Sequence, residues 1–237
     1  MIRVADYSDM GGRSDNEDTV LWTRTDEGVL CLVVADGLGG HGGGKTASMA
    51  AAEAICGGWD GTTDREKLKV LAQKAHEAVL AHQNPSCAMK STVAALLLSD
   101  AEASWIHAGD TRLYHFIDGK LVFQTKDHSA SQIAVVLGEI TPDQIRFHED
   151  RSRVLKALGQ EGDLVVEAGG APLTPGKHAF LLCTDGFWEY VLEEEMEADL
   201  CAAENPADWI ARMRVRHRER IPEDNDNNSA AAVWTER

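Results

Sequence analysis

The sequence lacks the features that mark a membrane-inserted or secreted chain. No apolar run approaches the roughly 20 residues that a membrane-spanning helix requires. The first residues, MIRVADYSDMGG, lack the basic start and the long apolar stretch of a signal peptide. We therefore expect a cytoplasmic protein.

Paired cysteine motifs are also missing. The five cysteines are widely scattered, no two form a C-x-x-C pair, and an odd number cannot all pair within the chain. We expect them to be reduced and mostly buried, where cysteine behaves as a small apolar residue. They are Cys31, Cys56, Cys87, Cys183 and Cys201.

Positive charge is scarce, because 39 acidic residues face 23 lysines and arginines and give a net charge of −16. This balance argues against nucleic acids and anionic membranes as partners. The 237 residues show no repeat, low-complexity tract or linker, so we expect a single domain over residues 1–237. Nothing in the sequence requires more than a monomer.

The periodicity of apolar residues predicts an α+β fold. Residues 19–35 predict a β-hairpin around the turn Asp26-Glu27-Gly28, and residues 91–125 predict consecutive strands in an antiparallel meander. Helical spacing predicts the first two helices as neighbours packed on a sheet. Helices are expected at 45–59, 65–83, 193–203 and 206–220, short helices within 130–150, and further strands at 164–170, 178–186 and 229–236.

One glycine-rich loop raises an alternative function. Residues Gly39–Thr46 read GGHGGGKT and satisfy the phosphate-loop pattern G-x-x-x-x-G-K-[ST], after an apolar run and before a helix-like run. An NTPase that uses this loop is therefore one hypothesis. However, a phosphate loop belongs to a βαβ unit that feeds a parallel sheet, and the strands here predict antiparallel pairing.

Acids recur at the ends of apolar runs, beside Gly, Asn or His. Each one alone is typical of a turn. Together, carboxylates from several strand ends can form an all-oxygen site for Mg²⁺ or Mn²⁺, and one arginine among them suits a phosphate group. Such a set indicates two-metal hydrolysis of a phosphate ester. The five places are RSDNED (13–18), VVADG (33–37), IHAGD (106–110), LLCTDG (181–186) and EDNDNNS (223–229).

The order of these motifs resembles a known family. The motifs follow one another as GGRSDNED, VVADGLGGHGGGKTAS, STVAALLL, IHAGDTRLYHF, KDHSASQ, HEDRSRVLKALG, FLLCTDGFWEYV and DNNSAAAVW. In this order the sequence is similar to the metal-dependent Ser/Thr protein phosphatases of the protein phosphatase 2C type, in their bacterial single-domain form. The resemblance covers nearly the whole chain. It implies an antiparallel β-sandwich flanked on both faces by helix pairs.

The resemblance also implies roles for particular residues. Asp36 would bridge two metal ions, with the Gly37 carbonyl and Glu17 completing one of them and Asp185 and Asp226 binding the other. The remaining implied ligands and groups are Asp18, orienting metal-bound water, Asp110, binding a third and weaker ion, Arg13, holding the phosphate, and His41, a general acid near the leaving group.

The activity implied by the resemblance is hydrolysis of phosphoserine and phosphothreonine on proteins that a bacterial Ser/Thr kinase phosphorylates. A hydroxide bridging two Mn²⁺ or Mg²⁺ ions would attack phosphorus directly, without a phosphoenzyme. Under this reading, Lys45 and Thr46 are surface and first-turn residues of a helix. A pseudophosphatase that only binds phosphoproteins is a further alternative, and the NTPase remains the third hypothesis.

Overall fold

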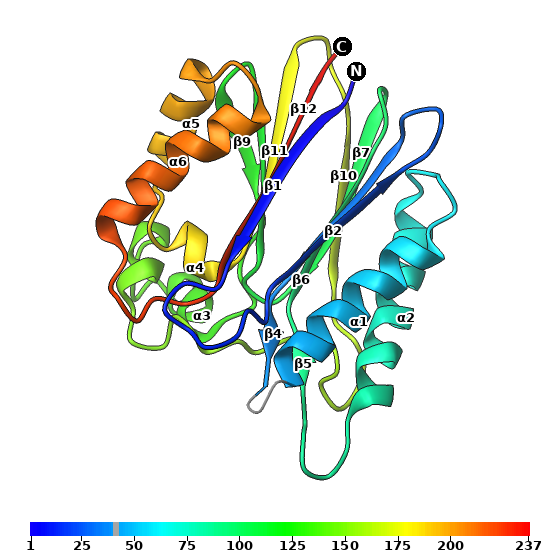
Figure 1. The fold of residues 1–237 in the computed structure, drawn as a ribbon, viewed down its shortest axis with the longest axis vertical. Coiled ribbons are helices and arrows are strands. Elements are labelled where there is room, and N and C mark those ends of the chain that lie inside the picture. Colours follow the sequence, from blue (N-terminus) through cyan, green and yellow to red (C-terminus); the bar gives the residue numbers. More distant parts are fainter. Residues whose placement is uncertain (40–42) are drawn as a thin grey trace.

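The computed structural model describes residues 1–39 and 43–237, and it places two five-stranded antiparallel sheets face to face (Figure 1). One sheet has the order β1-β12-β11-β8-β9 and the other β10-β7-β6-β3-β2. The strands of the first are β1 Arg3–Asp9, β12 Asn228–Glu236, β11 Lys177–Cys183, β8 Arg112–Ile117 and β9 Lys120–Gln124. Those of the second are β10 Glu167–Pro172, β7 Glu102–Ala108, β6 Val93–Leu98, β3 Leu30–Ala35 and β2 Thr19–Arg24.

Helix pairs cover the outer faces of both sheets. α1 (Gly43–Gly58) and α2 (Arg65–His82) lie on the second sheet, and α5 (Glu193–Ala202) and α6 (Pro206–Arg220) lie on the first (Figure 1). The predicted α+β sandwich flanked by helix pairs is confirmed. Short elements complete the fold, namely β4 Gly37–Leu38, β5 Lys90–Ser91, α3 Ala130–Val136, the 3₁₀ helix Pro142–Phe147 and α4 Asp185–Trp188.

The central strands are buried on both faces because each sheet lies between the other sheet and a helix pair. In β3, Leu32 and Val34 face the core between the sheets, whereas Cys31 and Val33 face α1 and α2. This alternation follows from the two-residue period of a strand. It also explains why LCLVVA is apolar throughout, although the sheet is antiparallel.

The predicted meander over residues 91–125 is only partly correct. β6 pairs with β7, and β8 pairs with β9, but β7 and β8 belong to different sheets. The chain crosses between the sheets at Gly109–Thr111, where Gly109 has a φ of +96°. A side chain there would press against Thr92, so the crossing requires glycine.

The strand ends that carry the predicted acids gather at one end of the sandwich. β3 runs into Asp36 and β4, and β11 runs into Asp185 and α4, whereas both chain termini lie at the opposite end (Figure 1). None of the helices formed by residues 1–39 and 43–237 has the length and apolar character needed to cross a membrane.

Candidate metal centre

Most of the predicted site residues line one small cavity of about 230 Å³ at this end of the sandwich. They are Arg13, Glu17, Asp36, Gly37, Asp110, Asp185 and Asp226, and Leu38, Gly39, Ser152, Val154 and Asn227 complete the lining. Asp18 does not line the cavity but is buried behind it. His41 lies outside the described residues.

Hydrogen bonds with Ser91 of β5 and with Thr92, which lies between β5 and β6, hold the backbone of Asp36. Its N–H donates to Thr92 Oγ1 over 3.0 Å, and its carbonyl accepts from Thr92 N over 2.9 Å and from Ser91 Oγ over 3.1 Å. Thr92 Oγ1 also lies 2.6 Å from Thr111 Oγ1, next to Asp110. The same threonine thus links the chain segments that carry two of the acids.

Two glycines allow a close approach of backbone and carboxylate. A Cβ on Gly37 would overlap the carbonyl oxygen of Gly44, and a Cβ on Gly44 would lie 2.5 Å from the Glu17 carboxylate. In the native chain, Gly44 N donates to Glu17 Oε1 over 3.1 Å. The beginning of α1 therefore packs directly against Glu17, and part of the glycine-rich loop serves this contact.

Asn227 connects the two acidic loops, a role that the sequence analysis missed. Its Oδ1 accepts from Glu17 N over 2.8 Å, and its Nδ2 donates to the carbonyls of Met10 and Asp15 over 2.8 and 2.9 Å. The Asp226-Asn227 pair in the sequence was the available signal. Asp226 lines the cavity, whereas its neighbour Asp224 does not.

Arg13 is placed beside the acids at the mouth of the cavity. Its Nη2 lies 2.9 Å from Asp226 Oδ2, and both side chains are about half exposed. The guanidinium of Arg13 is therefore accessible from solvent at the mouth of the cavity, where it forms an ion pair with the Asp226 carboxylate.

The carboxylates raise one another's pKa. Burial first, and then the neighbouring acids, hold the pKa of Asp36 and of Asp185 well above the usual range. Burial raises the pKa of Asp110 to about 7, with Asp127 as the next cause. Buried and crowded carboxylates are stabilised by nearby cations, so this set of oxygen donors suits divalent ions.

Asp18 provides a second indication that the site would be stabilised by a bound cation. Burial raises its pKa to about 7, although Thr184 Oγ1 donates to its Oδ2 over 2.9 Å. Its other oxygen, Oδ1, is buried and has no hydrogen-bond partner among the described residues. A buried unpaired carboxylate oxygen is costly, and metal-bound water would satisfy it.

Lys45 lies in the first turn of α1, as expected, and its ammonium group is hydrogen-bonded to the segment behind the acids. Its Nζ donates to the Asp18 carbonyl over 2.7 Å and to Thr19 Oγ1 over 3.3 Å. The ammonium group therefore fixes the segment behind the acids. All pairings between the named strands of the described residues are antiparallel. These residues therefore form no βαβ unit with parallel strands, which is the structure that carries a phosphate loop in NTPases.

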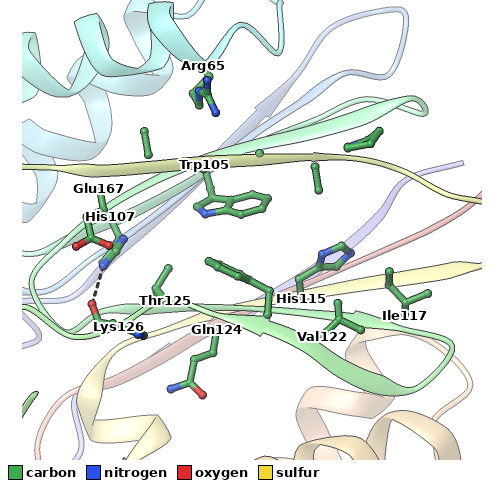
Figure 2. A pocket seen from close by; sticks show the side chains of 16 residues that line it. Arg65, Trp105, His107, His115, Ile117, Val122, Gln124, Thr125, Lys126 and Glu167 are labelled. Atoms are coloured by element: carbon green, nitrogen blue, oxygen red, sulfur yellow. Dashed lines mark hydrogen bonds between the residues drawn. The ribbon is translucent and has the colours of Figure 1, made fainter. Parts of the chain in front are cut away.

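A separate group of possible metal ligands lies at the open edge between β9 and β10. One atom each of His107, His128 and Glu167 lie within 4.8 Å of one another, and Figure 2 shows His107 and Glu167 in the cavity there. However, His128 Nδ1 accepts from Gly109 N over 3.2 Å, so the neutral ring carries its hydrogen on Nε2, which lies 3.3 Å from Glu167 Oε1. A metal ion would need a lone pair at that atom.

The hydrogen bonds therefore favour a structural role for this group. His107 Nε2 lies 2.8 Å from the Lys126 carbonyl, shown as a dashed line in Figure 2, and the two imidazoles stack with centroids 4.7 Å apart. Asp127, beside His128, forms a buried bidentate ion pair with Arg112 over 2.7 and 2.8 Å. Both observations favour a structural role for Asp127 and His128.

The fold and the cavity together define a class, a β-sandwich protein with an acidic cavity at one end whose oxygen donors suit divalent cations. Comparisons with known proteins specify it further. The sequence profile of the family described as Protein phosphatase 2C matches residues 8–220, so the chain belongs to this family.

Individual relatives agree with this assignment. The Serine/threonine protein phosphatase PstP of Mycobacterium tuberculosis is 33% identical over 202 residues, which cover 82% of this chain and 38% of that protein. The chain thus spans well under half of that relative. The Serine/threonine phosphatase stp of Listeria monocytogenes is 30% identical over 195 residues, 78% of this chain and 77% of that protein.

Solved structures show the same architecture. The crystal structure of the Mycobacterium tuberculosis phosphatase PstP/Ppp superimposes with a TM-score of 0.86 at 29% identity, covering 100% of this chain and 99% of that one. A structure of the PstP catalytic domain in complex with two manganese ions gives a TM-score of 0.82 at 28% identity, covering 98% and 97%.

Proposed function

We propose that the chain is a metal-dependent phosphatase that hydrolyses phosphoserine and phosphothreonine on proteins. The observation that carries the proposal is the convergence of five carboxylates and one accessible arginine on one cavity of about 230 Å³. Family membership and the names of the relatives support it.

The proposed cofactors are two Mn²⁺ or Mg²⁺ ions, as in the relative with two bound manganese ions. Asp36 would be shared between the ions, with Glu17 and the Gly37 carbonyl on one side and Asp185 and Asp226 on the other. Asp110 would hold a third, weaker ion, and Asp18 would orient water from behind. Bound ions of this kind supply a hydroxide near neutral pH and positive charge for the phosphoryl group.

The residues of the chain would position the substrate and the ligands. Arg13 would exchange its contact with Asp226 for two phosphate oxygens, which its planar guanidinium can bind in bidentate fashion. Asn227 and Gly44 would hold Glu17 in place through the hydrogen bonds to its backbone and its carboxylate. His41 is the proposed general acid for the departing alkoxide.

The finer partner assignments are also proposals. The substrates would be phosphoproteins that a Ser/Thr kinase phosphorylates, and the protein would act as a cytoplasmic monomer. The net charge of −16 supports the proposal that nucleic acids are not partners.

The test is release of phosphate from a phosphothreonine peptide with Mn²⁺, comparing the wild type with Asp36→Asn, while ATP hydrolysis is followed in parallel. We expect peptide hydrolysis that requires Mn²⁺, stops on chelation and falls at least about a hundredfold in Asp36→Asn, because a shared ligand is lost. Turnover of ATP with an untouched peptide would contradict the proposal. Phosphopeptide binding without turnover would favour the pseudophosphatase.

A further inference from the structure

Two thiols face each other between α1 and the sheet that it covers. The Sγ atoms of Cys31 on β3 and Cys56 on α1 are 3.9 Å apart. Cys31 is completely buried, whereas Cys56 is partly exposed, with its Sγ 3.8 Å from the Leu21 carbonyl. A disulfide needs about 2.05 Å between sulfurs, so an approach of roughly 2 Å separates the thiols from a bond.

We propose that Cys31 and Cys56 are a modification site, a thiol pair that hydrogen peroxide oxidises to a disulfide across β3 and α1. The site is independent of the phosphatase proposal, because neither cysteine lines the acidic cavity. The remaining cysteines are free as well, and no hydrogen bond between thiols involves them in the described residues.

The exposures of the two thiols set the order of the reaction. Cys56 reacts first, since it is the partly exposed residue of the pair: its thiolate attacks one peroxide oxygen, the O–O bond breaks, and the departing hydroxide takes up the proton that the thiol released and becomes water. The Cys56 sulfenic acid is then attacked by the Cys31 sulfur, the S–S bond forms, and the hydroxyl leaves as water with the Cys31 proton. In total, two thiols and one peroxide give one disulfide and two waters.

The electrostatics of Cys31 support this order. Its hydrogen bond with Cys56, and then its burial, hold the pKa of the Cys31 thiol far above the usual range. Because the thiolate is the nucleophile, Cys31 does not react with peroxide on its own. It attacks only once an electrophilic sulfur has formed beside it.

The disulfide would fasten α1 to the sheet. β3 leads into Asp36, and the first turn of α1 contacts Glu17 through Gly44, so the bond joins two elements that support the acidic cavity. It would close a loop of about 25 residues, for which the loop-entropy relation and the usual size scaling give a rise in Tm on the order of 7–14 °C.

The experiment treats the full-length protein with hydrogen peroxide and maps its peptides without reduction. We expect a mass loss of two hydrogens, a peptide that links Cys31 to Cys56, and a Tm that rises and then returns after dithiothreitol. Cys201→Ser, which removes the exposed cysteine, should behave like the wild type. Cys31→Ser should leave Cys56 as a sulfenic or sulfinic acid with no internal disulfide.

The mapping of the wild type decides the proposal without any variant or activity assay. If Cys31 still reacts fully with iodoacetamide after peroxide and unfolding, or if Cys56 is found only as sulfinic acid, the pair does not close and the proposal is wrong. A disulfide between two chains through Cys201, with Cys31 and Cys56 both reduced, would overturn it too.

Discussion

Replacing Gly44 by alanine tests how closely α1 must approach the acidic cavity. The added Cβ would lie 2.5 Å from the carboxylate of Glu17 and 2.6 Å from the carbonyl oxygen of Gly37. Ordinary contacts begin at 3.4 Å, so these groups must move by about 0.8–0.9 Å. Both groups are proposed ligands of the same metal ion.

A displacement of this size is large on the scale of metal coordination. Mg²⁺ and ions like it hold oxygen ligands at about 2.1 Å in nearly fixed directions, so a shift of this size removes one ligand or both from the ion. Disturbed support of ligands typically costs ten- to a hundredfold in metal affinity. We therefore expect Gly44→Ala to raise the Kd for Mn²⁺ by at least tenfold, and overpacking to cost about 1–3 kcal/mol of stability.

The same helix offers a matched control. Gly57 also lies in α1, and a Cβ there would meet nothing within 4 Å. Gly57→Ala should leave the affinity for Mn²⁺ unchanged and add up to about 1 kcal/mol of stability, since alanine is the better helix former. Isothermal titration with Mn²⁺ measures both variants. A Gly44→Ala protein that binds Mn²⁺ like the wild type would refute the packing argument.

Three other perturbations follow from the same structure. Asp127→Ala removes the bidentate partner of the buried Arg112 guanidinium and leaves only the Glu193 carboxylate 3.6 Å away, so urea unfolding should show a loss of about 3–5 kcal/mol; a loss below about 1 kcal/mol would contradict the importance of the Asp127 ion pair. Thr92→Val removes the acceptor for Asp36 N and should cost about 1–3 kcal/mol and weaken Mn²⁺ binding in titrations, while unchanged binding would show that the bond does not position Asp36. Burial, and then a neighbouring histidine, lower the pKa of His115 to about 4. The unfolded chain therefore binds more protons than the folded chain between about pH 6.5 and 4. The free energy of unfolding decreases as the pH is lowered through that window. His115→Phe should lose about 2 kcal/mol less than the wild type between pH 7.5 and 5 in urea titrations, and identical slopes would exclude the effect.

Much of the architecture could be predicted from periodicity and turn residues. The hairpin around residues 26–28 and both helix pairs are confirmed. β1 was not identified, because its edge position leaves RVADYSD without a continuous apolar pattern. The segment with β7 and β8 was predicted as part of one meander, since both strands are buried on both faces and carry no signal of sheet membership.

The cavity was predictable only as a set of acids. The ordered motifs indicated Asp36, Asp185 and Asp226, and the structure brings their side chains to one cavity. The supporting contacts were not visible in the sequence, because they join residues far apart in the chain. Asn227 Oδ1 accepts from Glu17 N, and Lys45 Nζ donates to the Asp18 carbonyl.

The most direct test of the central claim is the rate of phosphate release from a phosphothreonine peptide as Mn²⁺ is titrated, in Asp226→Asn and Asp224→Asn. Only Asp226 lines the cavity, although the two acids are neighbours in the chain. The account predicts that Asp226→Asn needs at least about tenfold more Mn²⁺ or loses turnover, while Asp224→Asn follows the wild-type curve. Wild-type behaviour of Asp226→Asn, or turnover that does not depend on Mn²⁺, would contradict a metal-dependent phosphatase built on these carboxylates.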